Sequence, residues 1–189
     1  VPIGSGLGGG SANGAAVLKE LNNLYDLGLS IFELEKVGVS VGADVSFFIR
    51  GGTQLGEGIG NKLTPLPNPI SGIYLLVIPN IFINTSWAYT ELGKKLKFDT
   101  TVPNFRGFLN EDNSSYKFEI FENDFERIVI PAYPEIGTIK QKLLELGARF
   151  ASLSGSGSTV FGIFDDDTLV TKAESFFQTS YQTILANPA

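Results

Sequence analysis

The first residues with a recognisable chemical use are five glycines within the stretch Pro2-Ile3-Gly4-Ser5-Gly6-Leu7-Gly8-Gly9-Gly10-Ser11. An Ala-rich stretch follows, in which apolar residues recur at helical spacing, so we expect a helix to begin near Ser11. The first turn of a helix has unpaired N–H groups and the positive end of the helix dipole, and glycines let an anion approach the backbone closely. The pattern therefore predicts a phosphate-binding loop.

Three other kinds of loop share part of this pattern. A Walker loop needs Gly-Lys-Ser/Thr, and the first lysine of the chain is Lys19. A dinucleotide-binding fingerprint matches Gly4-Ser5-Gly6-Leu7-Gly8-Gly9 in spacing alone, and only Asp26 stands where a ribose-binding acid would be expected. A flexible linker is the third alternative, although a linker is not usually followed directly by an amphipathic helix.

The chain contains no His and no Cys, so any proton transfer must use Asp, Glu, Lys or Tyr. A Ser-His-Asp triad, a thiolate nucleophile and a metal site built on His or Cys are excluded. Asp44, in Gly42-Ala43-Asp44-Val45, is a candidate base, but an Asp after a helix-ending glycine is often only a turn residue. Asp165-Asp166-Asp167 is expected to be a solvated turn and helix start rather than a metal site.

The remaining patterns predict a mixed α+β protein without internal repeats. Ser30 with Glu33 is typical of a capping box, and Pro134 and Gly147 mark the two ends of a helix. Helices are expected at residues 11–26, 31–42, 86–92, 134–146 and 167–177, and strands at 73–78, 150–153, 159–164 and 181–185. Residues 42–50 predict a turn followed by an apolar strand, 51–64 a hairpin and 65–72 a linker, whereas 97–120 have no clear period.

A second Gly/Ser loop, residues 154–158, lies between two of these predicted strands. A tight turn is a sufficient physical explanation for it, and a ligand contact is the alternative. Asn123-Asp124-Phe125-Glu126 has a cap residue with Glu three positions later, so it is expected mainly to start a helix and to bury its Phe. The alternative is that its carboxylates support the site.

Composition narrows the classes of protein further. The chain of 189 residues has 14 Lys and Arg against 20 Asp and Glu, and this net charge of −6 argues against a general nucleic-acid binder. Its 43% of hydrophobic residues is enough for a core, but no apolar run approaches the roughly 18 residues that cross a membrane. No signal peptide is evident, so a cytoplasmic location is expected. There is no Met, and the chain opens inside a loop, so we expect an internal fragment whose N-terminal part is missing.

Five stretches resemble the GHMP kinases, a family of small-molecule kinases that includes galactokinase, homoserine kinase and mevalonate kinase. The resemblance covers essentially the whole chain and implies a two-domain α+β fold. Residues 1–68 would end an N-terminal catalytic domain of the ribosomal protein S5 domain 2-like type, and residues 69–189 would form a ferredoxin-like C-terminal domain. The stretches are the loop from Pro2 to Ala12, Gly42-Ala43-Asp44-Val45-Ser46-Phe47-Phe48, Asn84-Thr85-Ser86-Trp87-Ala88-Tyr89, Asn123-Asp124-Phe125-Glu126 and Ser152-Leu153-Ser154-Gly155-Ser156-Gly157-Ser158-Thr159-Val160-Phe161-Gly162.

The resemblance implies that ATP with Mg²⁺ is the co-substrate and that an alcohol carrying a cytidine diphosphate group accepts its γ-phosphoryl group. Asp44 would be the catalytic base, paired with a Lys from upstream of the chain, and no metal ligand from the chain is implied. Tyr89 would stack on the cytosine. The other expected substrate contacts are Thr85, Gly155, Ser156 and Gly157, and the expected ATP contacts are Pro2, Ile3, Gly4, Ser5, Gly6, Leu7, Gly8, Gly9, Gly10, Ser11 and Ala12.

Several alternatives and limits accompany this expectation. The substrate of another GHMP kinase could be homoserine, mevalonate or a sugar, and a non-catalytic nucleotide-binding relative or a purely structural module would share much of the pattern. A monomer and a homodimer are both open, no nucleic-acid or membrane partner is expected, and the fragment alone is expected to be inactive. Family members usually carry Pro where this chain has Ser46, which is expected to loosen the turn after Asp44, and Ala where it has Gly14.

Overall fold

The computed structural model describes residues 2, 4–60, 62–66, 70–95, 118 and 121–188. These residues fall into two compact units. Of the described residues, the N-terminal unit contains 8–60 and 62–66, and the C-terminal unit contains 2, 4–7, 70–95, 118 and 121–188. Each unit has its own cluster of buried apolar side chains, so each is described by itself. Of the stretch 97–120, only Phe118 is among the described residues.

The N-terminal unit contains three helices and a two-stranded antiparallel sheet. The elements are α1 (Gly9–Leu24), α2 (Ile31–Val41), α3 (Val45–Arg50), β1 (Gln54–Glu57) and β2 (Lys62–Pro65). The predicted capping box of α2 is confirmed, because Ser30 Oγ accepts a hydrogen bond from Glu33 N and Glu33 Oε2 accepts one from Ser30 N. Hydrogen bonds from the side chain and backbone of Ser30 lower the pKa of the Glu33 carboxyl below its ordinary value.

Residues 42–50 differ from the prediction, because the apolar run after the turn is the helix α3 and not a strand. A short apolar run does not by its period distinguish a strand from a helix. Val45 and Ile49, one helical turn apart, are buried with Ala15 of α1 and Leu34 of α2, so packing between helices decides the conformation. The hairpin predicted next to it is confirmed by the pairing of β1 with β2.

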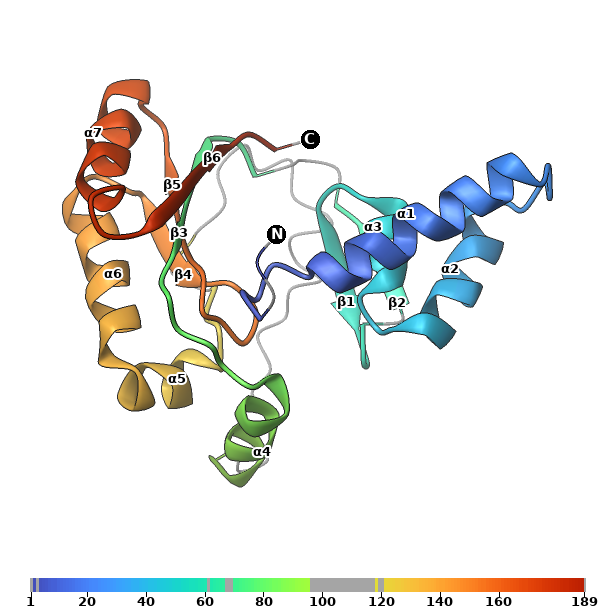
Figure 1. Cartoon of the computed structure of the whole chain (residues 1–189), viewed down its shortest axis with the longest axis horizontal. Helices are drawn as coiled ribbons and strands as arrows, with labels where there is room; N and C mark the ends of the chain where they lie inside the picture. Colours follow the sequence, from blue (N-terminus) through green and yellow to red (C-terminus); the bar gives the residue numbers. More distant parts are fainter. Residues whose placement is uncertain are drawn as a thin grey trace. The chain divides into compact units, whose positions relative to one another are not determined.

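The C-terminal unit is an antiparallel sheet with helices packed on one face. Its sheet has four strands among the described residues, namely β3 (Ile73–Ile78), β4 (Phe150–Leu153), β5 (Val160–Phe164) and β6 (Gln182–Ala186). Their order is β4-β5-β3-β6, and each neighbouring pair is antiparallel. Two βαβ-type halves connected in this order make a ferredoxin-like arrangement, so the predicted α+β class is confirmed. Helices α6 (Pro134–Glu145) and α7 (Asp167–Phe177) lie along one face of the sheet (Figure 1). The helices α4 (Thr85–Lys95) and α5 (Glu126–Ala132) belong to the same unit.

The core of this unit lies between the sheet and these helices. Alternate residues of β3, Leu75 and Val77, are fully buried and pack in one cluster with an apolar stripe of α6. That stripe, Ile136, Ile139 and Leu143, is 0–2% exposed. The opposite face of the sheet is aromatic, with the rings of Tyr74 and Phe161 stacked at 6.1 Å. In the described part of the chain, no helix has the length and apolar character needed to cross a bilayer.

Candidate active site

The start of α1 has the features of an anion-binding site. Gly8 precedes the helix with φ of 64°, in the left-handed region, and no side chain caps the helix. The first hydrogen bond of the helix runs from Ala12 N to Gly8 O, at 2.9 Å, so the N–H groups just before Ala12 have no partner within the helix. The first turn contains no acidic side chain that would repel an anion. The backbone N–H groups and the helix dipole are therefore available to phosphate.

Gly8 and Gly10 differ in whether the surrounding structure requires a glycine at that position. A Cβ on Gly8 would lie 2.7 Å from the ring of Phe48, and its positive φ also disfavours a side chain. A Cβ on Gly10 would have no atom within 4 Å. Packing therefore explains Gly8 but leaves Gly10 without a structural explanation.

Asp44 is the residue immediately before α3, at the N-terminal end of that helix, in the same unit. It is exposed, and its side chain makes no hydrogen bond that caps the helix. The next residue, Val45, lies beside the second turn of α1, since a Cβ on Gly14 would be 3.5 Å from Val45 Cγ2. The carboxylate of Asp44 is therefore not used in local capping, and it stands where α3 meets the glycine-started helix.

Two side chains of α3 anchor it to α2. Ser46 is 1% exposed, and its Oγ donates to the carbonyl oxygen of Glu35 at 3.0 Å. Arg50 donates to both oxygens of the Glu35 carboxylate, at 2.5 and 2.6 Å, and this ion pair raises the pKa of Arg50. Ser46 thus joins the segment after Asp44 to α2 through its hydroxyl group.

The first half of the glycine loop, residues 4–7, packs on the second Gly/Ser loop within the C-terminal unit. Thr159 N donates to Ser5 O at 3.1 Å, and Ser154 Oγ donates to Gly6 O at 2.9 Å. A Cβ on Gly6 would lie 2.1 Å from Ser154 O, so close approach of two backbones requires this glycine. The hydroxyls of Ser5 and Thr159 are buried without a hydrogen-bond partner.

The predicted substrate residues of α4 lie near this second loop. Thr85 Oγ1 and Ser156 Oγ are 3.3 Å apart, within hydrogen-bond distance. Tyr89, one turn further along α4, is 63% exposed, and its ring contacts Phe125 edge to face at 4.9 Å. A largely exposed ring is not ordinary core, so Tyr89 is available to stack on a ligand.

The structure thus brings Thr85, Tyr89 and residues 155–157 into one region of the C-terminal unit. In the N-terminal unit it packs α3, the helix that begins after Asp44, beside α1. Ile3 lies outside the described residues. The sequence left open that the carboxylates of residues 123–126 support the site. It did not reveal that Asn123 binds the second Gly/Ser loop or that Glu126 binds the end of β4, because their spacing was also that of a helix cap.

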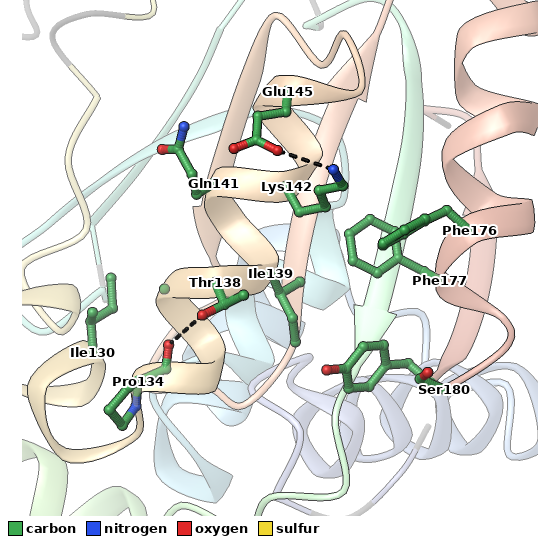
Figure 2. Close-up of a pocket in the computed structure, with 12 residues that line it drawn as sticks. Ile130, Pro134, Thr138, Ile139, Gln141, Lys142, Glu145, Phe176, Phe177 and Ser180 are labelled. Atoms are coloured by element: carbon green, nitrogen blue, oxygen red, sulfur yellow. Dashed lines mark hydrogen bonds and ion pairs between the residues drawn. The ribbon is translucent and has the colours of Figure 1, made fainter.

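One pocket of the C-terminal unit is lined by no predicted site residue. A hollow of about 650 Å³ lies between α6 and α7, with Lys142, Phe176 and Phe177 in its wall (Figure 2). Among the described residues, no three His, Cys, Asp or Glu side chains gather in a way that could hold a metal ion.

Two family models match the chain. The model of the GHMP kinase N-terminal domain matches residues 1–52, and the model of the GHMP kinase C-terminal region matches residues 104–183. Two solved structures show the same fold, namely a 4-(cytidine 5'-diphospho)-2C-methyl-D-erythritol kinase with a TM-score of 0.77 and 25% identity, and a homoserine kinase from Cytophaga hutchinsonii with 0.80 and 21%. The two matches span 99% and 100% of this chain, respectively, and 67% of each solved chain.

The sequence identities to curated relatives distinguish between the branches of the family better than the likeness of the folds does. The chain is 41% identical to the 4-diphosphocytidyl-2-C-methyl-D-erythritol kinase of Thermodesulfovibrio yellowstonii, over 94% of this chain and 64% of the relative. The corresponding values for the enzyme of that name from Syntrophotalea carbinolica are 43%, 93% and 61%, and for that of Citrifermentans bemidjiense 38%, 97% and 67%. The chain spans less than two thirds of the length of the first two relatives.

These matches show that the chain belongs to the GHMP kinase family. The curated relatives to which it is similar are the 4-diphosphocytidyl-2-C-methyl-D-erythritol kinases of that family.

Proposed function

We propose that the intact protein transfers the γ-phosphoryl group of ATP to the 2-hydroxyl of 4-diphosphocytidyl-2-C-methyl-D-erythritol, a step of the non-mevalonate route to isoprenoids. The observation that carries the proposal is the uncapped, glycine-started end of α1 beside the helix that bears Asp44. The names of the relatives at 38–43% identity supply the substrate. A cytoplasmic location, where ATP is plentiful, is part of the proposal.

The ATP phosphates are proposed to bind at the start of α1. Backbone N–H groups of residues 8–12 would donate to phosphate oxygens, and the helix dipole would stabilise their charge. Gly8 provides the left-handed turn, and the open space at Gly10 allows a phosphate to approach the backbone. The residues present therefore fit a triphosphate, and Mg²⁺ that arrives with ATP would neutralise charge on it during transfer.

Asp44 is proposed to orient the accepting hydroxyl and to take its proton. The hydroxyl oxygen attacks the γ-phosphorus, the bond from that phosphorus to the β-γ bridging oxygen breaks, and ADP leaves. The hydroxyl proton passes to a carboxylate oxygen of Asp44, which is exposed and not used as a cap. Ser46 and Arg50 anchor α3 to α2 and so reduce the movement of the helix that begins at Asp44.

The cytidine end of the substrate is proposed to stack on Tyr89. Its exposed ring, held edge to face by Phe125, presents a π-face to a base, and such stacking is worth about 1–3 kcal/mol per base. Thr85 and Ser156 add hydroxyl groups next to it.

The test is ADP release by the intact protein with and without the cytidine-linked alcohol, for the wild type and Asp44→Asn. We expect substrate-dependent turnover that falls at least about 100-fold in Asp44→Asn while ATP still binds, since loss of a general base costs roughly 10²–10⁴-fold. Turnover with homoserine, mevalonate or a sugar in place of this substrate would contradict the substrate assignment. ATP binding without turnover on any of these alcohols would favour a non-catalytic relative.

A further inference from the structure

The second Gly/Ser loop leaves β4 at a place where the described part of the sheet provides one neighbouring strand. Among the described residues, β4 is an edge strand of the sheet β4-β5-β3-β6, and its backbone pairs with β5. The N–H and C=O groups on the other side of an edge strand need partners from elsewhere. At Leu153, the last residue of β4, those partners come from residues 123–126, which we call the clamp turn.

Asn123 binds two carbonyl groups of the loop with one amide. Its Nδ2 donates to Leu153 O and to Gly155 O, each at 2.8 Å. Its Oδ1 accepts from Phe125 N at 3.0 Å, which fixes the orientation of the amide. One side chain therefore joins the end of the strand to the first glycine of the loop.

Glu126 binds the same strand end through its carboxylate. Oε1 accepts from Leu153 N at 2.9 Å and from Ser152 Oγ at 3.1 Å, while Oε2 pairs with Lys140 Nζ at 2.5 Å. The Glu126 side chain is 15% exposed, so these bonds are largely shielded from water. Its function extends beyond starting α5, because its carboxylate is committed to β4 and α6.

Phe125, between these two residues, contacts the ring of Tyr89 edge to face. The clamp turn therefore contacts both elements that carry proposed substrate contacts, the loop at residues 155–157 and helix α4. Thr85 and Ser156 close the connection, because their hydroxyls are 3.3 Å apart.

We propose that Asn123 and Glu126 are positioning residues that set the second Gly/Ser loop relative to Tyr89 for phosphoryl transfer. This inference rests on the proposed kinase function. Neither residue touches the reacting atoms; each acts through the backbone of residues 153–155. A displacement of about 1 Å in such a site can cost about 100-fold in rate.

The test compares variants of the intact protein by kcat, by KM for the cytidine-linked alcohol, by Tm and by hydrogen exchange of the Leu153 amide. Glu126→Ala removes the acceptor of that amide, whereas Glu126→Gln keeps an oxygen that can accept from it. Asn123→Asp keeps the size of the side chain but cannot donate to the two carbonyl groups. Asp124→Asn is the matched control, because Asp124 lies in the same turn, is 52% exposed and pairs with Arg127 at 3.5 Å.

We expect Glu126→Ala and Asn123→Asp to lower kcat by about 10- to 100-fold in protein that stays folded at the assay temperature. Exchange of the Leu153 amide should be faster in Glu126→Ala, while Glu126→Gln and Asp124→Asn should stay within about threefold of wild type in both exchange and kcat. A Glu126→Ala protein with fast exchange but wild-type kcat and KM would overturn the proposal. Equal loss of kcat in Glu126→Gln and Glu126→Ala would also overturn it, because the ion pair with Lys140 would then be the cause.

The same measurements separate this proposal from the proposed function. A wild-type protein without turnover on the cytidine-linked alcohol would refute the substrate assignment. Unchanged exchange of the Leu153 amide in Glu126→Ala would refute the clamp, whatever the substrate.

Discussion

Gly10 offers a test of the phosphate site that is separate from a test of the fold. A Cβ on Gly10 would have no atom within 4 Å, and Gly10 has no positive φ that would disfavour a side chain. Gly10→Ala should therefore stabilise α1 by up to about 1 kcal/mol, which is the usual difference between Ala and Gly in a helix. If Gly10 has no part in binding phosphate, this change in stability should be the only effect of the substitution.

The phosphate site predicts a second effect. The Cα–Cβ bonds of a helix tilt toward its N-terminus, so the added methyl group would point toward the space assigned to the phosphates. Loss of one charge-assisted hydrogen bond costs about 1.5–3 kcal/mol. The expected result is a 10- to 100-fold weaker affinity for ATP, on the order given by about 1.4 kcal/mol per factor of ten.

Gly14→Ala is the matched control, because Gly14 lies one turn further along the same helix. Its Cβ would lie at ordinary contact distances of 3.5–3.9 Å from Val41 and Val45. Calorimetric titration with ATP and unfolding in urea should show higher stability in both variants but weaker ATP binding in Gly10→Ala alone. Wild-type ATP affinity in a folded Gly10→Ala protein would refute the phosphate site at α1.

Three further predictions concern the supports of the site. Gly6→Ala should destabilise the protein by about 2–4 kcal/mol in urea unfolding, from the left-handed backbone and the 2.1 Å approach to a carbonyl oxygen; a smaller loss than 1 kcal/mol would contradict the packing of the two loops. Ser46→Ala should cost about 1 kcal/mol, and a gain in stability would mean that this hydroxyl loosens α3 after all. The pKa of the Glu33 carboxyl is lowered in the folded state, mainly by its hydrogen bonds with Ser30, so the unfolded chain binds more protons there. This stabilisation is therefore present above the ordinary pKa of a glutamate and is lost as the pH falls through the lowered pKa. The stability difference between wild type and Glu33→Gln should therefore shrink from pH 6 to pH 3, and a difference independent of pH would contradict the capping box as its source.

Sequence patterns predicted the elements whose signals are local. The capping box at Ser30 and the proline start of α6 depend on neighbours along the chain, and the structure confirms them. The helix α3 was missed because its six residues, four of them apolar, fit either conformation until α1 and α2 pack against them.

The residues of the candidate site likewise fall into those that a local sequence pattern reveals and those that only the three-dimensional structure reveals. The glycine loop and its helix are visible in the sequence, because their chemistry depends on residues in one continuous stretch. The contacts of Asn123 and Glu126 with Leu153 cross about 30 residues and depend on which strand lies at the sheet edge. The difference between Gly6, which is packed, and Gly10, which is open, also requires the three-dimensional structure.

The most direct test of the central claim is the identity of the product. The intact protein would be incubated with ATP, Mg²⁺ and 4-diphosphocytidyl-2-C-methyl-D-erythritol, and the product examined by phosphorus NMR and mass spectrometry. We expect one added phosphoryl group, as a monoester on the 2-hydroxyl, together with an equal amount of ADP. An unchanged substrate, or a phosphoryl group on another hydroxyl, would contradict the assignment.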